Sequence, residues 1–326
     1  MEILFWGSVR YNSGPDNVNK GIVKNLTETF YWTNSKSSLF PSVNDVKHLI
    51  KSDVVVISGL SRDVYIMAIL TKLFRKTLVY ILHGYFAYES KVNESKKVGF
   101  GVMMERLILK MADLILPVSK KFMAWFHTMC PKYKYKTKYL YNGMEKDLLS
   151  RCVATSKIEG SIIATGGDRI VKCNDILAEV VESLYGDSKL EIYGCLKNTV
   201  NNQYTYVKYM GNVQHMQFMQ KLAQTELFVL NSIYEPYCLA VVEALFCGCS
   251  ILVSEVAGVT DLLTLEESDI IHDPMDRNEI KEKILYLQQH PNNKRIMAKL
   301  DIDEYSYAKQ VQRLEKFCED LLKKSV

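Results

Sequence analysis

The chain has 326 residues, of which 48% are hydrophobic and 24% charged, a composition typical of a globular protein long enough for two domains. No apolar run reaches 18 residues and the N-terminus M-E-I-L-F-W-G resembles a strand, so we expect neither a transmembrane helix nor a signal peptide. The eight cysteines lack C-x-x-C spacing, which favours a reducing cytosol over a disulfide framework.

The charge is unevenly distributed along the chain. Residues 1–150 hold 22 Lys and Arg against 12 Asp and Glu, whereas the remainder holds 19 against 25, giving net charges of +10 and −6. A basic first half followed by an acidic second half indicates two domains with different partners.

The first half alternates strands and helices. Ile3–Trp6 predicts a short strand, and the apolar, β-branched runs Val54–Ser58 and Thr77–Leu82 flank a helical stretch, Asp63–Phe74. This βαβ alternation predicts a parallel sheet. Gly14, in the loop after the first strand, would let a ligand approach the backbone closely, although a single loop glycine is often only a turn.

His83 follows the Thr77–Leu82 strand directly. At the carboxyl end of a parallel strand it could bind a substrate hydroxyl or serve only as a structural loop residue. The polar, lysine-bearing segment Phe86–Gly101 is predicted to be a mobile loop on the acceptor side, and it precedes a helix over Val102–Ala112.

Basic and aromatic side chains alternate over Lys120–Lys138. Lysines interleaved with Trp and Tyr suit an anionic lipid surface, at about 1 kcal/mol for each lysine. Nucleic acid could use the same composition, and a solvated basic strand edge explains it equally well. We prefer the membrane surface to nucleic acid.

The second half begins after a linker predicted over Lys146–Gly160. A strand, Ile162–Thr165, runs into a Gly166-Gly167 turn that is followed by Arg169 and Lys172. A glycine turn with nearby cations at a strand end is a reasonable cradle for a diphosphate, although such turns are common.

Two acids stand at a later junction between strand and helix, in the stretch E-P-Y-C-L-A-V-V-E that runs from Glu235 to Glu243. Pro236 and the helical spacing of apolar residues predict a helix over Tyr237–Cys247. Its first amides, near Cys238 and Leu239, would offer partial positive charge to an anion. A Glu before Pro is also often only a helix cap. The two acids alone could therefore either bind a ligand or serve a purely structural role.

The stretch closely resembles the E-x7-E motif of the retaining glycosyltransferases of family 4, with both acids, the Pro and the C-G-C turn in register. The resemblance implies the α/β fold called GT-B, in which two Rossmann-like domains with parallel sheets flank an inter-domain cleft. We expect an acceptor-side domain over 1–150, a nucleotide-sugar donor domain over 151–305, and a terminal helix over 306–326 that crosses back toward the first domain.

The resemblance also implies roles for individual residues. Glu235 and His83 are the predicted catalytic residues, with Glu235 on the donor sugar, and Glu243 is predicted to bind the ribose. Lys172 keeps the register of the family's phosphate-binding Lys, while Arg169 is displaced by two positions from the expected Arg. The remaining donor-binding residues are Cys238, Leu239, Gly14 and Tyr237.

The implied activity is transfer of a hexose, with retention, from a nucleotide-sugar (UDP-linked by expectation) to a hydroxyl of a glycan or lipid-linked acceptor in bacterial-type surface polysaccharide synthesis. The nucleotide-sugar is a co-substrate, so we expect no cofactor; Asp301-Ile302-Asp303 lies outside a strand end, and we expect no metal and no nucleic acid partner. The expected location is cytoplasmic, peripheral on the inner face of the plasma membrane. Two alternatives remain: a non-catalytic nucleotide-sugar or glycan-binding subunit, and a nucleotide-sugar epimerase on the same fold.

Overall fold

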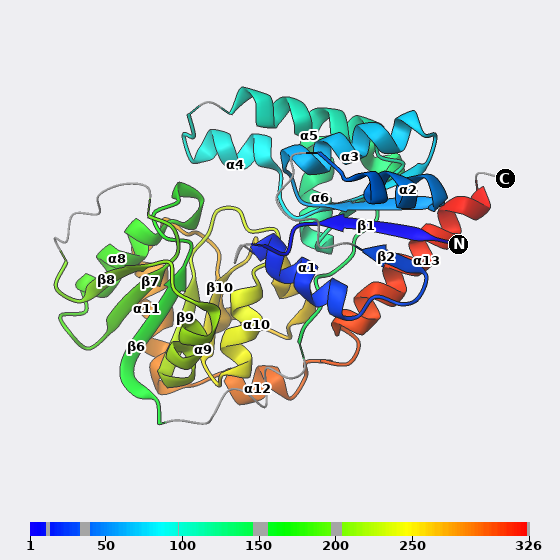
Figure 1. Cartoon of the computed structure of the whole chain (residues 1–326). Helices are drawn as coiled ribbons and strands as arrows, with labels where there is room; N and C mark the ends of the chain where they lie inside the picture. The colour runs from blue at the N-terminus through cyan, green and yellow to red at the C-terminus, as the bar shows by residue number, and fades with distance from the viewer. Residues whose placement is uncertain (11–13, 33–39, 97, 146–155, 197–203, 325–326) are drawn as a thin grey trace. The chain divides into compact units, whose positions relative to one another are not determined.

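The computed structural model describes residues 1–10, 14–32, 40–96, 98–145, 156–196 and 204–324 (Figure 1). The chain divides into two compact units. Unit 1 comprises Met1–Glu145 and Ile302–Val326, and unit 2 comprises Lys146–Asp301.

Unit 1 is built on a five-stranded parallel sheet with strand order β2-β1-β3-β4-β5. β1 pairs with β3 so that Gly7 lies opposite Ser58, and the two strands therefore end at the same level. The strands are almost completely buried because their runs are apolar on both faces, as expected for a parallel sheet. Their bounds are β1 Ile3–Gly7, β2 Phe30–Trp32, β3 Val54–Ser58, β4 Thr77–Leu82 and β5 Leu114–Pro117.

The helices of unit 1 follow the strands along the chain. α3 and α5 contact each other and the sheet, and α13 packs against α1. Their bounds are α1 Gly14–Lys24, α2 Val43–Lys51, α3 Arg62–Leu73, α4 Phe86–Val92, α5 Gly99–Met111, α6 Lys120–Met129, the 3₁₀ helix η1 Pro131–Lys136 and α13 Tyr307–Lys324.

The segment Phe86–Gly101 was predicted to be a mobile loop, but the structure places helices in it. It contains α4 and the first turn of α5. The cause is a buried carboxylate: Glu105 on α5 accepts hydrogen bonds from the backbone amides of Phe86 (2.7 Å) and Ala87 (2.9 Å). These amides begin α4 and have no partner within the helix, so Glu105 satisfies them from a distant position in the sequence.

Unit 2 has a six-stranded parallel sheet with strand order β11-β10-β9-β6-β7-β8. β6 begins at Ile158, so the predicted linker Lys146–Gly160 is wrong at its C-terminal end, and residues 146–155 lie outside the described residues. The strands are β6 Ile158–Thr165, β7 Lys189–Tyr193, β8 Val207–Gly211, β9 Thr225–Leu230, β10 Ser250–Ser254 and β11 Ile270–Ile271.

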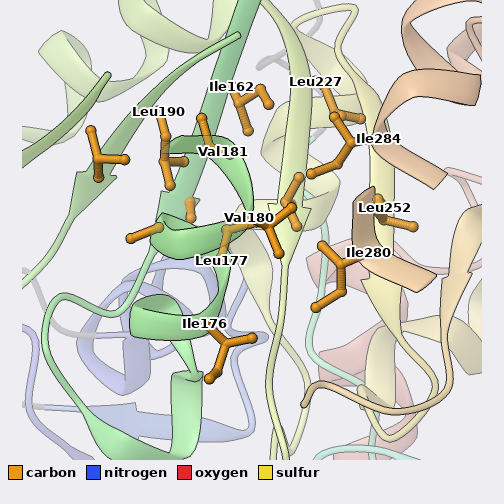
Figure 2. Close-up of a cluster of buried hydrophobic side chains, with 14 of the residues drawn as sticks. Ile162, Ile176, Leu177, Val180, Val181, Leu190, Leu227, Leu252, Ile280 and Ile284 are labelled. Atoms are coloured by element: carbon orange, nitrogen blue, oxygen red, sulfur yellow. The ribbon is translucent and has the colours of Figure 1, made fainter. Parts of the chain in front are cut away.

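Helices cover both faces of this sheet. α8 and α11 contact each other on one face, and α9 and α10 contact each other on the other. Figure 2 shows the core beneath α8 and α11, where Val180, Ile284 and Leu227 lie in one apolar cluster. The bounds are η2 Ile170–Lys172, α8 Asn174–Glu182, α9 His215–Gln224, α10 Leu239–Phe246, η3 Gly258–Leu262, η4 Glu267–Asp269, α11 Arg277–Gln289 and α12 Asn293–Met297.

One cysteine of unit 2 differs from the expectation of a reduced set. Cys247, directly after α10, is disulfide-bonded, whereas Cys238 and Cys249 are free. Disulfide pairing depends on distance in the fold, which sequence spacing does not reveal.

Each sheet contains one point where the strand order changes direction. In unit 1 this point lies between β1 and β3, and in unit 2 it lies between β6 and β9. In open α/β sheets, the crevice outside the carboxyl ends of the strands at such a point is where ligands bind. The segments that follow β1, β3, β6 and β9 are therefore the candidate ligand-binding segments.

The first residue of the last helix packs its aromatic ring closely against the rest of unit 1. Tyr307, the first residue of α13, packs so closely against two glycines that a Cβ built on Gly21 would lie 2.1 Å from its ring, and one on Gly143 would lie 2.4 Å from it. The amide of Gly143 also donates to Gln310 Oε1 on the same helix at 2.9 Å. Both contacts hold α13 on the body of unit 1.

Candidate functional site

The turn after β6 is a glycine pair that packs tightly on the end of β7. Gly166 and Gly167 both have positive φ (106° and 60°), and their amides donate to the carbonyl of Tyr193 at 2.7 and 3.0 Å. A Cβ on Gly167 would lie 2.1 Å from the carbonyl oxygen of Cys195, and one on Gly166 would lie 2.5 Å from Lys172 Cγ. Glycine is thus required at both positions, and the turn directs the chain back past Lys172.

Lys172 and Glu235 form an ion pair through Nζ and Oε2. Their side chains are only 7% and 12% exposed. Lys172 comes from the segment after β6 and Glu235 from the segment after β9, so the pair bridges the two strands at the switch point of unit 2. Two of the predicted residues are therefore brought together, although the predicted roles assign them to different parts of the donor.

Arg169, the displaced candidate for phosphate binding, lies on the same turn. It is half-buried, and its Nε donates to the carbonyl of Gly166 at 3.3 Å. The guanidinium thus stays beside the glycine turn, on the loop that also carries Lys172.

The segment between Glu235 and α10 is held in place by the loop at the start of η3. The amide of Gly258 donates to the carbonyl of Glu235, and that of Val259 to the carbonyl of Tyr237, both at 3.0 Å. Tyr237, predicted to contact the donor, is only 2% exposed, so the structure places its side chain inside the unit.

α10 begins at Leu239, two residues later than predicted, because Cys238 has φ 78° and leaves the right-handed helical region. The burial of the Cys238 thiol raises its pKa to about 12; Glu235 raises it further, Lys172 and the Val241 amide lower it, and Glu243 raises it. The thiol therefore lies close enough to Glu235, Lys172 and Glu243 for all three charges to affect its pKa. The first amides of α10, which have no intrahelical partner, begin at this cluster.

Glu243 lies one turn into α10, and its Oε1 is 2.8 Å from Nε2 of His215, the first residue of α9. The Glu243 side chain is 13% exposed. His215 was not among the site residues predicted from the sequence. The two residues are 28 positions apart, and only the contact between α9 and α10 brings them together.

Gly14 and His83 belong to unit 1 and lie near its own switch point. Gly14 is the first residue of α1, and no atom lies within 4 Å of a Cβ built on it. His83 Nε2 is 2.8 Å from Ser58 Oγ at the end of β3, and Ser58 in turn bonds to Asn19 on α1. Ser58 and Asn19 were missed from the sequence, where a strand-end serine and a helical asparagine carry no signal of their own.

Burial lowers the pKa of His83 to about 4, and the charge of Asp16 on α1 opposes this shift. The imidazole is therefore neutral at physiological pH. A neutral histidine can accept or donate a hydrogen bond to a hydroxyl but does not neutralise a phosphate.

The basic segment Lys120–Lys138 forms α6 and η1, so the solvated strand edge is not what the structure shows. Lys136 is buried, and its Nζ donates to the carbonyls of Lys110 (3.0 Å) and Ala112 (2.5 Å) that end α5. It is a capping residue for that helix. The exposed side chains of the segment include Lys120, Lys132, Lys134, Tyr135 and Lys138.

Across the ranges that the structure describes, no group of three or more His, Cys, Asp or Glu side chains is placed to hold a metal ion. No helix in these ranges has both the length and the apolar character needed to cross a bilayer.

Structural comparison gives the class to which this architecture belongs. The fold matches HepE of Anabaena in complex with UDP-glucose (TM-score 0.71, 15% identity, covering 98% of this chain and 100% of that one). It also matches sucrose-phosphate synthase of Thermosynechococcus elongatus (0.69, 13%, 99% and 99%) and WaaG, a glycosyltransferase involved in lipopolysaccharide biosynthesis (0.62, 14%, 94% and 97%). The predicted GT-B fold is confirmed.

Part of the sequence also matches a known protein family. Residues 176–300 match the family of glycosyl transferases group 1, which supports a GT-B glycosyltransferase. This range includes Glu235, Glu243 and His215 but begins just after Lys172. No curated protein matches the sequence.

Proposed function

We propose that this protein is a retaining glycosyltransferase with the E-x7-E motif of family 4, which transfers a hexose from a UDP-linked donor to a hydroxyl acceptor. The observation that carries the proposal is the nearly buried Lys172–Glu235 pair at the switch point of unit 2, beside the N-terminus of α10. A cation, an acid and a helix N-terminus at one place can serve the diphosphate and the sugar of one nucleotide-sugar.

The residues take separate roles in this proposal. Lys172 and the first amides of α10 bind the diphosphate, Arg169 supports it from the glycine turn, and Glu235 binds a hydroxyl of the donor sugar. Glu243, held by His215, binds the ribose. The contact between Glu243 and His215 orients the carboxylate before any nucleotide arrives.

In the reaction, the bond between the anomeric carbon and the diphosphate oxygen breaks, and its electron pair stays on the diphosphate. The acceptor hydroxyl then attacks the same face of the sugar, and its proton passes to the departing phosphate oxygen. Lys172 and the helix N-terminus lower the barrier because they stabilise negative charge that grows on the leaving group in the transition state. The proposed reaction needs no metal ion.

The comparisons support a UDP-sugar as the donor. HepE is known in complex with UDP-glucose, and the trehalose-6-phosphate enzyme of E. coli with UDP-2-fluoro glucose. WaaG acts in lipopolysaccharide biosynthesis. We therefore propose a glycan or lipid-linked acceptor in surface polysaccharide synthesis and a cytoplasmic location, peripheral on the inner face of the plasma membrane.

The exposed lysines of α6 and η1, with Tyr135 84% exposed among them, are the proposed contact with that anionic surface. Flotation with vesicles containing anionic lipid tests this contact. We expect binding that weakens as salt is raised and that falls on replacing Lys132, Lys134 and Lys138 by Ala. Binding unaffected by salt or by these replacements contradicts the membrane contact.

Donor binding is tested by calorimetry with UDP-glucose, UDP-galactose and GDP-mannose. The correct donor at 100 times its dissociation constant should stabilise the fold by about 2.7 kcal/mol. Lys172→Ala and Glu243→Ala should each weaken binding by roughly 10- to 100-fold, because each removes a hydrogen bond to a charged group. Lys299→Ala and Glu282→Ala, which alter exposed residues of the same unit, are the matched controls.

Unchanged affinity in both site variants would overturn the assignment. If a donor binds, product analysis decides among the activities: an α-configured product from an α-linked donor shows retention. An altered sugar nucleotide formed without acceptor would instead indicate an epimerase, and binding without turnover would indicate a non-catalytic subunit.

A further inference from the structure

A series of three linked hydrogen bonds crosses the switch point of unit 1. Asn19 Nδ2 donates to the carbonyl of Ser8 at 2.8 Å, Ser58 Oγ bonds to Asn19 Oδ1 at 2.6 Å, and Ser58 Oγ lies 2.8 Å from His83 Nε2. Asn19 and Ser58 are 1% and 2% exposed. These hydrogen bonds thus link the segment after β1, the end of β3 and the segment after β4 through Asn19 of α1.

The carbonyl of Ser8 determines the donor and the acceptor in each of these hydrogen bonds. A backbone carbonyl can only accept, so the Asn19 atom beside Ser8 must be the amide nitrogen, and the atom beside Ser58 must be the amide oxygen. Since that oxygen also only accepts, the single hydroxyl proton of Ser58 points to Asn19. The Ser58 oxygen is then left to accept, and His83 must supply the proton from Nε2.

This assignment has a consequence for the other ring nitrogen. A neutral imidazole carries one proton, so a proton on Nε2 leaves Nδ1 with a lone pair. In the described part of the chain, no hydrogen bond is made by His83 Nδ1. The low pKa of His83 is consistent with the neutral ring.

Asn19, the first side chain in this series of hydrogen bonds, is held by close packing. A Cβ built on Gly7 would lie 2.8 Å from Asn19 Nδ2 and 2.9 Å from Asn19 Cγ. Any side chain at position 7 would therefore displace the amide, so the amide plane cannot turn freely. The geometry is set by β1, α1 and β3 together, before a ligand binds.

We propose that Asn19 and Ser58 are positioning residues that fix His83 as the Nε2–H tautomer, so that Nδ1 accepts a hydrogen bond from a hydroxyl of a ligand bound at the switch point of unit 1. The proposal rests on the proposed function for the identity of the ligand. Its chemical consequence is selectivity: an acceptor nitrogen binds a hydroxyl but has no proton to offer to a ligand group that only accepts.

The first test is spectroscopic and is read on the wild-type protein. Long-range ¹H–¹⁵N correlation on protein with ¹⁵N-labelled histidine reports the tautomer of each ring, and the His83 signals are assigned by their loss in His83→Asn. We expect the Nε2–H pattern in the protein without ligand. A proton on Nδ1, or a mixture of the two tautomers, would overturn the proposal.

The second test uses variants of Ser58. Ser58→Ala should give mixed tautomers and lower kcat by about ten-fold, the effect of one lost hydrogen bond, while Ser58→Thr keeps the hydroxyl and should restore both. Ser52→Ala is the matched control, because Ser52 is also a buried serine of unit 1 that donates to a backbone carbonyl, that of Leu49 at 2.9 Å. If Ser58→Ala keeps the single tautomer and normal kcat, the proposal is contradicted.

The tautomer measurement is independent of the proposed function. A single Nε2–H tautomer in a protein that binds no nucleotide-sugar would overturn the glycosyltransferase assignment and support the hydrogen-bond direction. Conversely, normal donor binding together with a proton on Nδ1 would overturn only the positioning role of Asn19 and Ser58.

Discussion

Lys172 and Glu235, which are 63 positions apart in the sequence, form an ion pair with each other. The pair keeps two nearly buried charges satisfied at the place where the proposed donor binds. A diphosphate that binds Lys172 must therefore compete with Glu235, and separating the two frees the carboxylate for the sugar. Donor affinity thus includes the cost of opening this pair.

A double-mutant cycle measures the strength of the pair. Lys172→Met and Glu235→Gln should each lower the free energy of unfolding by about 3 kcal/mol, because each leaves a buried charge or polar group without its partner. The double variant should lose less than the sum of the two, by at least about 1 kcal/mol. Urea unfolding provides the values, and strict additivity would show that the two side chains are independent.

Cys238 has a backbone conformation that residues other than glycine rarely adopt, with φ 78°. Such a conformation costs about 1–2 kcal/mol for a residue with a Cβ. We therefore expect Cys238→Gly to raise the free energy of unfolding by about 1 kcal/mol. Cys238→Ala, which removes the thiol but keeps the Cβ, is the control, and equal stability of the two variants would contradict strain at this position.

Glu105 holds the start of α4, and burial raises its pKa to about 7 although the two backbone amides that it accepts from lower it. Glu105→Ala should lower the free energy of unfolding by about 2 kcal/mol, because two amides lose their acceptor. The same change should speed amide hydrogen exchange in Phe86–Val92. Glu28→Ala, at an exposed position of unit 1, is the control, and unchanged exchange in α4 would show that the cap is dispensable.

His83 should make unit 1 sensitive to acid. Its pKa falls from 6.5 to about 4 in the folded protein, so the unfolded chain binds a proton between these values while the folded one does not. Stability is therefore fully present above pH 6.5 and is lost as the pH falls toward 4, by up to about 3 kcal/mol.

Comparing the wild type with His83→Gln isolates this contribution, since the raised pKa of Glu105 acts in the opposite direction in both proteins. The variant should lose less stability than the wild type between pH 6.5 and 4 in urea titrations. His290→Gln, at the exposed end of α11, should behave as the wild type does. Parallel pH curves for wild type and His83→Gln would contradict a neutral buried imidazole.

The sequence predicted those parts of the fold whose signal is local. The apolar runs of β3 and β4 and the periodicity of α3 lie within a few residues of the predicted bounds. α4 was missed because its support comes from Glu105, on another helix. The capping role of Lys136 was missed for the same reason, since the carbonyls that accept from its ammonium belong to the end of α5.

The candidate site shows the same division. The resemblance to the family 4 motif pointed to Lys172, Glu235 and Glu243, but not to the pairing of Lys172 with Glu235 or of His215 with Glu243. Those contacts depend on which loops meet at the switch point, and strand order is not encoded in any short stretch. The contact between Asn19 and Ser58 depends on the pairing of β1 with β3, which brings the ends of the two strands to the same level.

Tyr307, packed against Gly21 and Gly143, also determines when unit 1 can be finished during synthesis. Unit 1 is discontinuous, and its last segment, Ile302–Val326, leaves the ribosome only after all of unit 2. Since chains emerge at about 5–20 residues per second, the sheet of unit 1 waits for roughly ten seconds or more without the helix that covers α1. During that interval the nascent chain exposes the surface of α1 that α13 later buries.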